Sequence, residues 1–145
     1  MAKRMTYWKA NVERIEGLNR AQSTAVYAED EYTDWSPDEV AGLMGARINL
    51  DAVYPFAEPK TGAPAALDYR GTNRVTYVKN QGSCGSCWAF AAAAVAEGKW
   101  AASTSLSTQE MLDCIGISDP CGGYFVDWAL QGVQTLGGWE KWSGA

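Results

Sequence analysis

Residues 81–90 read QGSCGSCWAF, and the rest of the chain can be interpreted outward from this stretch. Glycines and serines precede Cys87, whereas the residues that follow it, WAFAAAAVAE, contain neither Gly nor Pro. This composition predicts a turn-rich loop that leads into a helix starting at Cys87, with Ser86 as its N-cap. A helix N-terminus favours negative charge, so Cys87 is expected where a thiolate is stabilised.

Cys87 is therefore the candidate nucleophile. A cysteine attacks a carbonyl group as the thiolate. Backbone N–H groups at the start of the same helix could stabilise the resulting oxyanion, and the side-chain amide of Gln81 could supply a second donor. The 145 residues include no histidine, so no imidazole within this chain can act as the acid–base partner.

Three other interpretations of the cysteines compete with this one. A C-x-x-C at a helix start is also typical of a redox pair, here Cys84 with Cys87, although VTYVKNQGS is a poor buried strand to lead into it. Zinc could be bound by all four cysteines, which include Cys114 and Cys121. Cys87 could also be a structural residue of a core helix. The length of the motif favours the nucleophile.

The motif and its flanks resemble the papain-like cysteine peptidases, in particular the cathepsin-L-like branch. The family signature Q-G-x-C-G-S-C-W-A-F is matched without a gap. Residues 64–70 (PAALDYR) and 75–80 (VTYVKN) resemble the family's P-x-x-x-D-W-R and V-T-P-V-K-N segments. Residues 106–114 (LSTQEMLDC) resemble L-S-E-Q-E-L-x-D-C and predict a short helix that starts with a capping box. Residues 121–124 (CGGY) resemble C-x-G-G-Y with one residue missing.

The resemblance implies a role for several residues. Cys87 is the nucleophile, and Gln81 is the oxyanion-hole side chain. Gly122 and Gly123 match the glycines beside which substrate backbone pairs along the cleft. The family's reaction needs no cofactor or metal, and its substrates are peptides or proteins.

The resemblance also implies how the cysteines pair. Cys84 is expected to form a disulfide with Cys121, and Cys114 to pair with a cysteine beyond residue 145. An oxidising compartment suits this pairing, and the family works in lysosomes, in vacuoles or outside the cell. The first residues contain no apolar region typical of a signal peptide.

The first fifty residues carry a different pattern. Apolar residues at intervals of three and four predict an amphipathic helix. The same stretch resembles the family's propeptide pattern E-x3-R-x3-F-x2-N-x3-I-x3-N, through Arg4, Trp8, Asn11, Ile15 and Asn19. Residues 36–39 (SPDE) form a capping box with proline at the first helical position, which predicts a second helix.

Three segments are therefore expected. Residues 1–50 are a helical inhibitor-type propeptide. Residues 51–64 are a proline-rich linker, which in the family crosses the active-site cleft and is cut on activation. Residues 65–145 are the N-terminal helical half of the peptidase domain. The expected fold class is α-rich, one half of the α+β papain-like fold. The β-rich half, with the catalytic histidine and asparagine, is not in this chain.

The function expected from the resemblance is that of a cysteine endopeptidase precursor, inactive without a histidine. The alternative is a cysteine-protease inhibitor, in which residues 1–64 bind the clefts of other papain-like peptidases. A formal net charge of −5 disfavours nucleic acid and anionic membranes as partners, and no apolar run in the sequence approaches the length of a membrane span.

Overall fold

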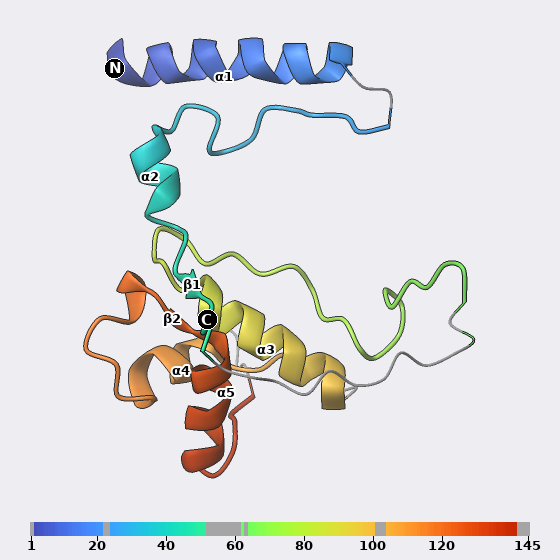
Figure 1. Ribbon diagram of the computed structural model, residues 1–145, viewed down its shortest axis with the longest axis vertical. Helices are drawn as coiled ribbons and strands as arrows, with labels where there is room; N and C mark the ends of the chain where they lie inside the picture. The colour runs from blue at the N-terminus through green and yellow to red at the C-terminus, as the bar shows by residue number, and fades with distance from the viewer. Residues whose placement is uncertain (1, 22–23, 52–61, 63, 101–103, 142–145) are drawn as a thin grey trace. The chain divides into compact units, whose positions relative to one another are not determined.

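The computed structural model describes most of the chain, namely residues 2–21, 24–51, 62, 64–100 and 104–141. It divides into two compact units, Met1–Leu43 and Met44–Ala145 (Figure 1). The described residues are helix-rich, with one sheet of two short strands, so the expected α-rich fold class is confirmed. Most of the predicted linker, residues 51–64, lies outside these ranges. Within them, no helix is long and apolar enough to cross a membrane.

The first unit contains both helices that the sequence predicts. Helix α1 spans Ala2–Ala21, and helix α2 spans Pro37–Ala41. The predicted capping box is present, because Ser36 Oγ accepts from the N–H of Glu39 while the carboxylate of Glu39 accepts from the N–H of Ser36 at 2.8 Å. The N–H of Ser36 and its hydroxyl, which donates to the same carboxylate at 3.0 Å, hold the pKa of Glu39 below its ordinary value, and the charge of Arg4 acts in the same direction.

Four residues of the propeptide-like spacing bind the chain that returns after α1. The contacts are Arg4 with Asp34 and Glu39, Trp8 with Glu29, Asn11 with Thr33, and Asn19 with Tyr27. The two asparagines bind main-chain groups. Asn19, for example, both donates to the carbonyl and accepts from the N–H of Tyr27, each at 2.8 Å. Spacings of three and four residues place these side chains on neighbouring turns of one helix face.

The second unit is built around helix α3 (Cys87–Trp100), against which α4 (Thr108–Cys114) and α5 (Val126–Thr135) pack (Figure 1). Small alanine side chains let α3 lie close to its neighbours. The core cluster consists of Trp88, Ala89, Ala92, Met111, Ala129 and Val133. The indole N–H of Trp88 donates to the carbonyl of Pro120 at 3.0 Å, so its polar end is satisfied inside this core.

Helix α4 begins after Ser107 as predicted, but the capping box expected there is only half formed. The hydroxyl of Ser107 accepts from the N–H of Glu110 at 3.2 Å. The carboxylate of Glu110 instead accepts from the N–H of Glu140 at 2.7 Å, and the N–H of Ser107 donates to the carbonyl of Glu140. The local spacing could not show a partner thirty residues further along the chain.

Candidate active site

Cys87 is the first residue of α3 and is half-buried. The helix therefore starts where the sequence predicted, and the N–H groups at the start of a helix lie ahead of its regular hydrogen-bond ladder. Ser86 precedes the helix and is buried, and its carbonyl accepts from the N–H of Ala89 at 2.8 Å. Its hydroxyl donates to the carbonyl of Cys84 at 3.5 Å, so this side chain also binds the loop before the helix.

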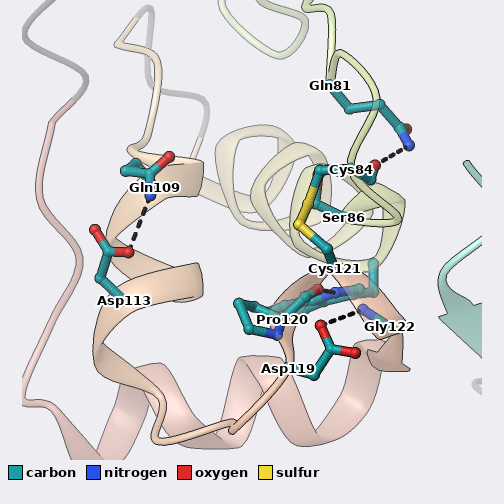
Figure 2. The surroundings of a disulfide bond; sticks show 10 residues. Gln81, Cys84, Ser86, Gln109, Asp113, Asp119, Pro120, Cys121 and Gly122 are labelled. Carbon is teal, nitrogen blue, oxygen red and sulfur yellow. Dashed lines mark hydrogen bonds between the residues drawn. A yellow bond between two sulfur atoms is a disulfide. The ribbon is translucent and has the colours of Figure 1, made fainter.

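A disulfide between Cys84 and Cys121 ties the loop before Cys87 to the turn beside it (Figure 2). Gln81 Nε2 donates to the carbonyl of Cys84 at 2.8 Å, so the amide assigned to the oxyanion hole lies against this loop (Figure 2). Cys87 and Cys114 are free. This pairing leaves neither a Cys84–Cys87 redox pair nor four thiolates for zinc. The described residues contain no group of three or more His, Cys, Asp or Glu side chains able to hold a metal.

The sulfur of Cys87 is covered by a segment from upstream in the chain. Its Sγ atom accepts two backbone hydrogen bonds, from the N–H of Gly45 at 3.0 Å and from the N–H of Ala46 at 2.9 Å. A thiolate attacks a carbonyl carbon, whereas the groups that meet this sulfur are N–H donors. Residues 45 and 46 therefore occupy the approach to the nucleophile and meet it with their N–H groups.

The covering segment is held in place by strand pairing. Strand β1 (Ala46–Arg47) pairs in parallel with strand β2 (Tyr124–Phe125), and the N–H of Tyr124 donates to the carbonyl of Gly45 at 2.8 Å. A side chain adds to this pairing, because Arg47 Nη2 donates to the carbonyl of Gly122 at 2.9 Å. Neither strand was predicted, because each is only two residues long.

Glycines permit the close approach of these segments. A Cβ atom on Gly45 would lie 1.6 Å from the carbonyl oxygen of Gly85. Gly123 has φ +96°, and a Cβ atom there would lie 2.6 Å from the carbonyl oxygen of Gly45. Of the two glycines predicted to border the cleft, Gly123 leaves space for Gly45, and the carbonyl of Gly122 accepts from Arg47. The N–H that donates to the carbonyl of Gly45 belongs to Tyr124. Gly45 was not predicted as a site residue, because its partners lie about 40 and 80 residues further along the chain, and Tyr124 was predicted only as part of the CGGY match.

The segment that contacts the sulfur of Cys87 lies upstream of the expected linker, and the linker's own path stays a prediction. The linker, residues 51–64, was expected to cross the cleft, and its residues 52–61 lie outside the described part of the chain. Gly45 and Ala46 contact the nucleophile, and both lie inside the stretch that the sequence analysis assigned to the propeptide.

A buried carboxylate binds the chain segment that leads to Gln81. Glu97, on α3, is 2% exposed. It accepts from Lys79 Nζ at 2.5 Å, from Thr76 Oγ1 at 2.7 Å and from the N–H of Leu106 at 2.7 Å. Burial alone raises the pKa of Glu97, but these three donors outweigh burial and hold the pKa below its ordinary value. Residues 75–80 have no regular secondary structure, and the contacts of Thr76 and Lys79 with this carboxylate tie them to the nucleophile helix.

Comparison with known proteins identifies the family to which the chain belongs. The family described as papain family cysteine protease matches residues 63–143. Mouse cathepsin K is 36% identical over 150 residues, covering 93% of this chain and 45% of cathepsin K. The viral cathepsin of Choristoneura fumiferana nuclear polyhedrosis virus is 33% identical over 146 residues, covering 94% of this chain and 45% of the viral protein. The chain belongs to the papain family of cysteine proteases.

Solved structures agree with the sequence relatives. The proform of the ragweed pollen allergen Amb a 11, a cysteine protease, superposes with a TM-score of 0.82 at 30% identity. The match covers 97% of this chain and 48% of the allergen. This chain thus spans about half the length of the relatives and solved structures that it matches.

Proposed function

We propose that this chain carries the nucleophile-bearing part of a cysteine endopeptidase in its precursor state. In this proposal Cys87 attacks the carbonyl carbon of a peptide bond, an S–C bond forms, and the carbonyl electron pair moves onto oxygen. The backbone N–H of Cys87 and the amide of Gln81 then stabilise that oxyanion. An imidazole from outside residues 1–145 takes the thiol proton and gives it to the leaving amine as the oxyanion collapses and the C–N bond breaks. Water then hydrolyses the thioester, which releases the carboxylic acid and restores the thiol.

One observation carries the proposal. The sulfur at the start of α3 accepts hydrogen bonds from the N–H groups of Gly45 and Ala46, and Ala46 begins the strand β1 that pairs with β2. A segment held in this way excludes a substrate from the sulfur, which is what a precursor requires. When the segment leaves, a peptide or protein substrate could pair with β2 in its place, beside Gly122 and Gly123. A lysosomal, vacuolar or extracellular site of action stays a prediction, which the Cys84–Cys121 disulfide supports.

The test compares two thiols in one molecule. A peptidyl chloromethyl ketone alkylates a thiolate by displacing chloride, and it requires no histidine on the protein. On the Gly45→Ala variant, in which the covering segment cannot keep its place, this reagent should label Cys87 in preference to Cys114, although Cys114 is exposed and Cys87 is half-buried. Chloroacetamide, which lacks the peptide, should show no such preference. Mass spectrometry of the labelled peptides gives both ratios. Preferential labelling of Cys114 by the peptidyl reagent would count against a substrate-binding nucleophile.

A second candidate function is inhibition in trans, in which residues 1–64 bind another papain-like peptidase. The observation that favours it is that residues 2–43 form a compact unit with their own polar contacts. The experiment uses the whole chain as a Cys87→Ser, Cys114→Ser variant, added to active mouse cathepsin K. Reversible inhibition that is lost when Asn11 and Asn19 are both replaced by Ala supports this function. No inhibition at high micromolar concentration rejects it and leaves the precursor proposal untouched.

A further inference from the structure

Residues 74–79, which lead to Gln81, lie beside helix α3 without packing closely on it. The segment and the helix together line a hollow of about 320 Å³. The apolar side chains of the segment do not fill this hollow, since Val75 and Tyr77 are more than half exposed and Val78 is 98% exposed. Apolar burial therefore contributes little to holding the segment against the helix.

Three polar side chains hold the segment instead. Arg74 Nη1 donates to the carbonyl of Gly98 at 3.1 Å, near the end of α3. Thr76 and Lys79 both donate to the carboxylate of Glu97, which is buried. Hydrogen bonds to a charged group in a buried site are among the strongest in proteins. The two contacts on Glu97 are therefore expected to decide where the segment lies along the helix.

The position of Gln81 depends on that of Lys79. An extended chain advances at most about 3.6 Å per residue, so the Cα atoms of these two residues lie within about 7 Å of each other. Gln81 Nε2 in turn donates to the carbonyl of Cys84, in the loop before Cys87. Glu97 and Cys87 belong to the same helix. An anchor on Glu97 thus places the segment relative to the nucleophile.

We propose that Glu97 is a positioning residue, which acts through Thr76 and Lys79 to hold the amide of Gln81 where it can donate to the oxyanion formed at Cys87. The oxyanion role of Gln81 rests on the proposed function, whereas its placement by Glu97 concerns only this chain. In Glu97→Gln one acceptor oxygen becomes an NH₂ donor, so the side chain cannot keep all its contacts. The segment, and Gln81 with it, should then be less well fixed.

The first measurement needs no ligand. In the chain labelled with ¹⁵N-glutamine, NMR gives the rate at which the side-chain amide protons of Gln81 exchange with water. Its hydrogen bond to Cys84 slows this exchange, and Glu97→Gln should speed it about three- to tenfold, as expected for weakening one hydrogen bond. Gln109, whose Nε2 donates to Asp113 at 3.0 Å on α4, is the internal reference and should not change. Unchanged exchange at Gln81 would overturn the proposal.

The second measurement tests the oxyanion donor with a peptide aldehyde. The aldehyde adds reversibly to Cys87: an S–C bond forms, the carbonyl electron pair moves onto oxygen, and that oxygen takes the thiol proton. The Gly45→Ala, Cys114→Ser chain is used, because its covering segment is displaced and Cys87 is its free thiol. Glu97→Gln should weaken aldehyde binding about five- to twentyfold, less than removal of an oxyanion donor. Alkylation by iodoacetamide forms no oxyanion and should keep its rate.

A double-mutant cycle separates positioning from general damage to the fold. In a Gln81→Ala background, Glu97→Gln should not weaken aldehyde binding further, because no donor is left to position. Glu110→Gln is the matched control. It is the same substitution at a half-buried carboxylate of the same unit, where the partner is the N–H of Glu140, and it should bind the aldehyde like the parent. Thr76→Val removes one donor to Glu97 and should give a smaller change in the same direction, also if Glu97→Gln fails to fold.

The outcomes distinguish the two levels of the argument. Weakening by Gln81→Ala but not by Glu97→Gln, or equal weakening by Glu97→Gln in both backgrounds, would overturn the inference and leave the proposed function intact. No weakening by Gln81→Ala would remove the oxyanion role of Gln81 and the inference with it. Failure of the aldehyde to bind would count against the proposed function, and proton exchange at Gln81 would then decide the inference alone. Circular dichroism and mapping of the Cys84–Cys121 link confirm that each variant is folded.

Discussion

Lys79 Nζ lies 2.5 Å from Glu97 Oε1, in an ion pair whose carboxylate side chain is 3% exposed and whose ammonium side chain is 16% exposed. The same carboxylate also accepts from Thr76 and from the N–H of Leu106. It therefore joins three stretches of chain: the segment that leads to Gln81, the nucleophile helix, and the segment before α4. No other carboxylate in the described part of the chain is buried to this degree.

Glu97→Gln should destabilise the second unit. The amide removes the charge that compensates Lys79 and leaves at least one donor unpaired in a buried site. We expect a loss of about 2–4 kcal/mol in the free energy of unfolding, because breaking a buried pair on one side is costly. Urea denaturation followed by tryptophan fluorescence measures it. Glu16→Gln, in an exposed pair with Arg20, is the control and should cost less than about 0.5 kcal/mol. Equal effects of the two substitutions would contradict the anchoring role of Glu97.

The contribution of Glu97 should also depend on pH. Its pKa in the folded chain is lower than in the unfolded chain, so the unfolded chain binds more protons in the acid range. The stabilisation is complete above the ordinary pKa of a glutamate and is lost as the pH falls through the lower, folded value. The difference in unfolding free energy between the parent and Glu97→Gln should therefore be constant from neutral pH to about pH 5 and shrink below it. A difference unchanged down to about pH 3 would show that the carboxylate is not the group responsible.

Gly45→Ala should uncover Cys87 without unfolding the helical core. The new Cβ would meet the carbonyl of Gly85, so the covering segment has to move away from the sulfur. We expect alkylation of Cys87 to accelerate by roughly an order of magnitude, because both N–H contacts and the strand pairing are lost together. Gly17→Ala is the control, since a Cβ there meets nothing within 4 Å and alanine favours the helix. If Gly45→Ala labels at the parent rate, residues 45–47 do not shield the thiol.

The cysteines allow a separate test. The Cys84–Cys121 link closes a separation of 37 residues, for which chain entropy predicts a stabilisation of about 4 kcal/mol. Cys84→Ser with Cys121→Ser should lower the stability of the second unit by an amount of this order. Thiol titration of the denatured, non-reduced parent chain should find two free thiols, at Cys87 and Cys114. Four free thiols, or a main disulfide between Cys84 and Cys87, would reject the pairing.

Local patterns predicted the helices, whereas the contacts between distant segments could not be read from the sequence. The alanine-rich run after Cys87 and the capping box at Ser36 each specify a helix through neighbouring residues, and both predictions are confirmed. The strand β1 is two residues long and has no apolar alternation that could predict it. It is held by its pairing with β2 and by the space that Gly123 leaves. Glu97 was not singled out in the sequence, because its donors lie 9 to 21 residues away along the chain.

The last prediction concerns activity. The 145-residue chain should neither hydrolyse a fluorogenic peptide nor remove its own N-terminal segment, at acid or at neutral pH. No histidine is present to accept and return a proton, and loss of the base in a nucleophile–histidine pair costs on the order of 10⁴- to 10⁶-fold in rate. The N–H contacts to the sulfur also have to break before a substrate can approach. Turnover of the peptide and the intact mass of the chain after incubation are the two measurements, with Cys87→Ala as the control for contaminating protease. Cleavage that is present in the parent and absent in Cys87→Ala would mean that another group in this chain, or the peptide itself, performs the proton transfer.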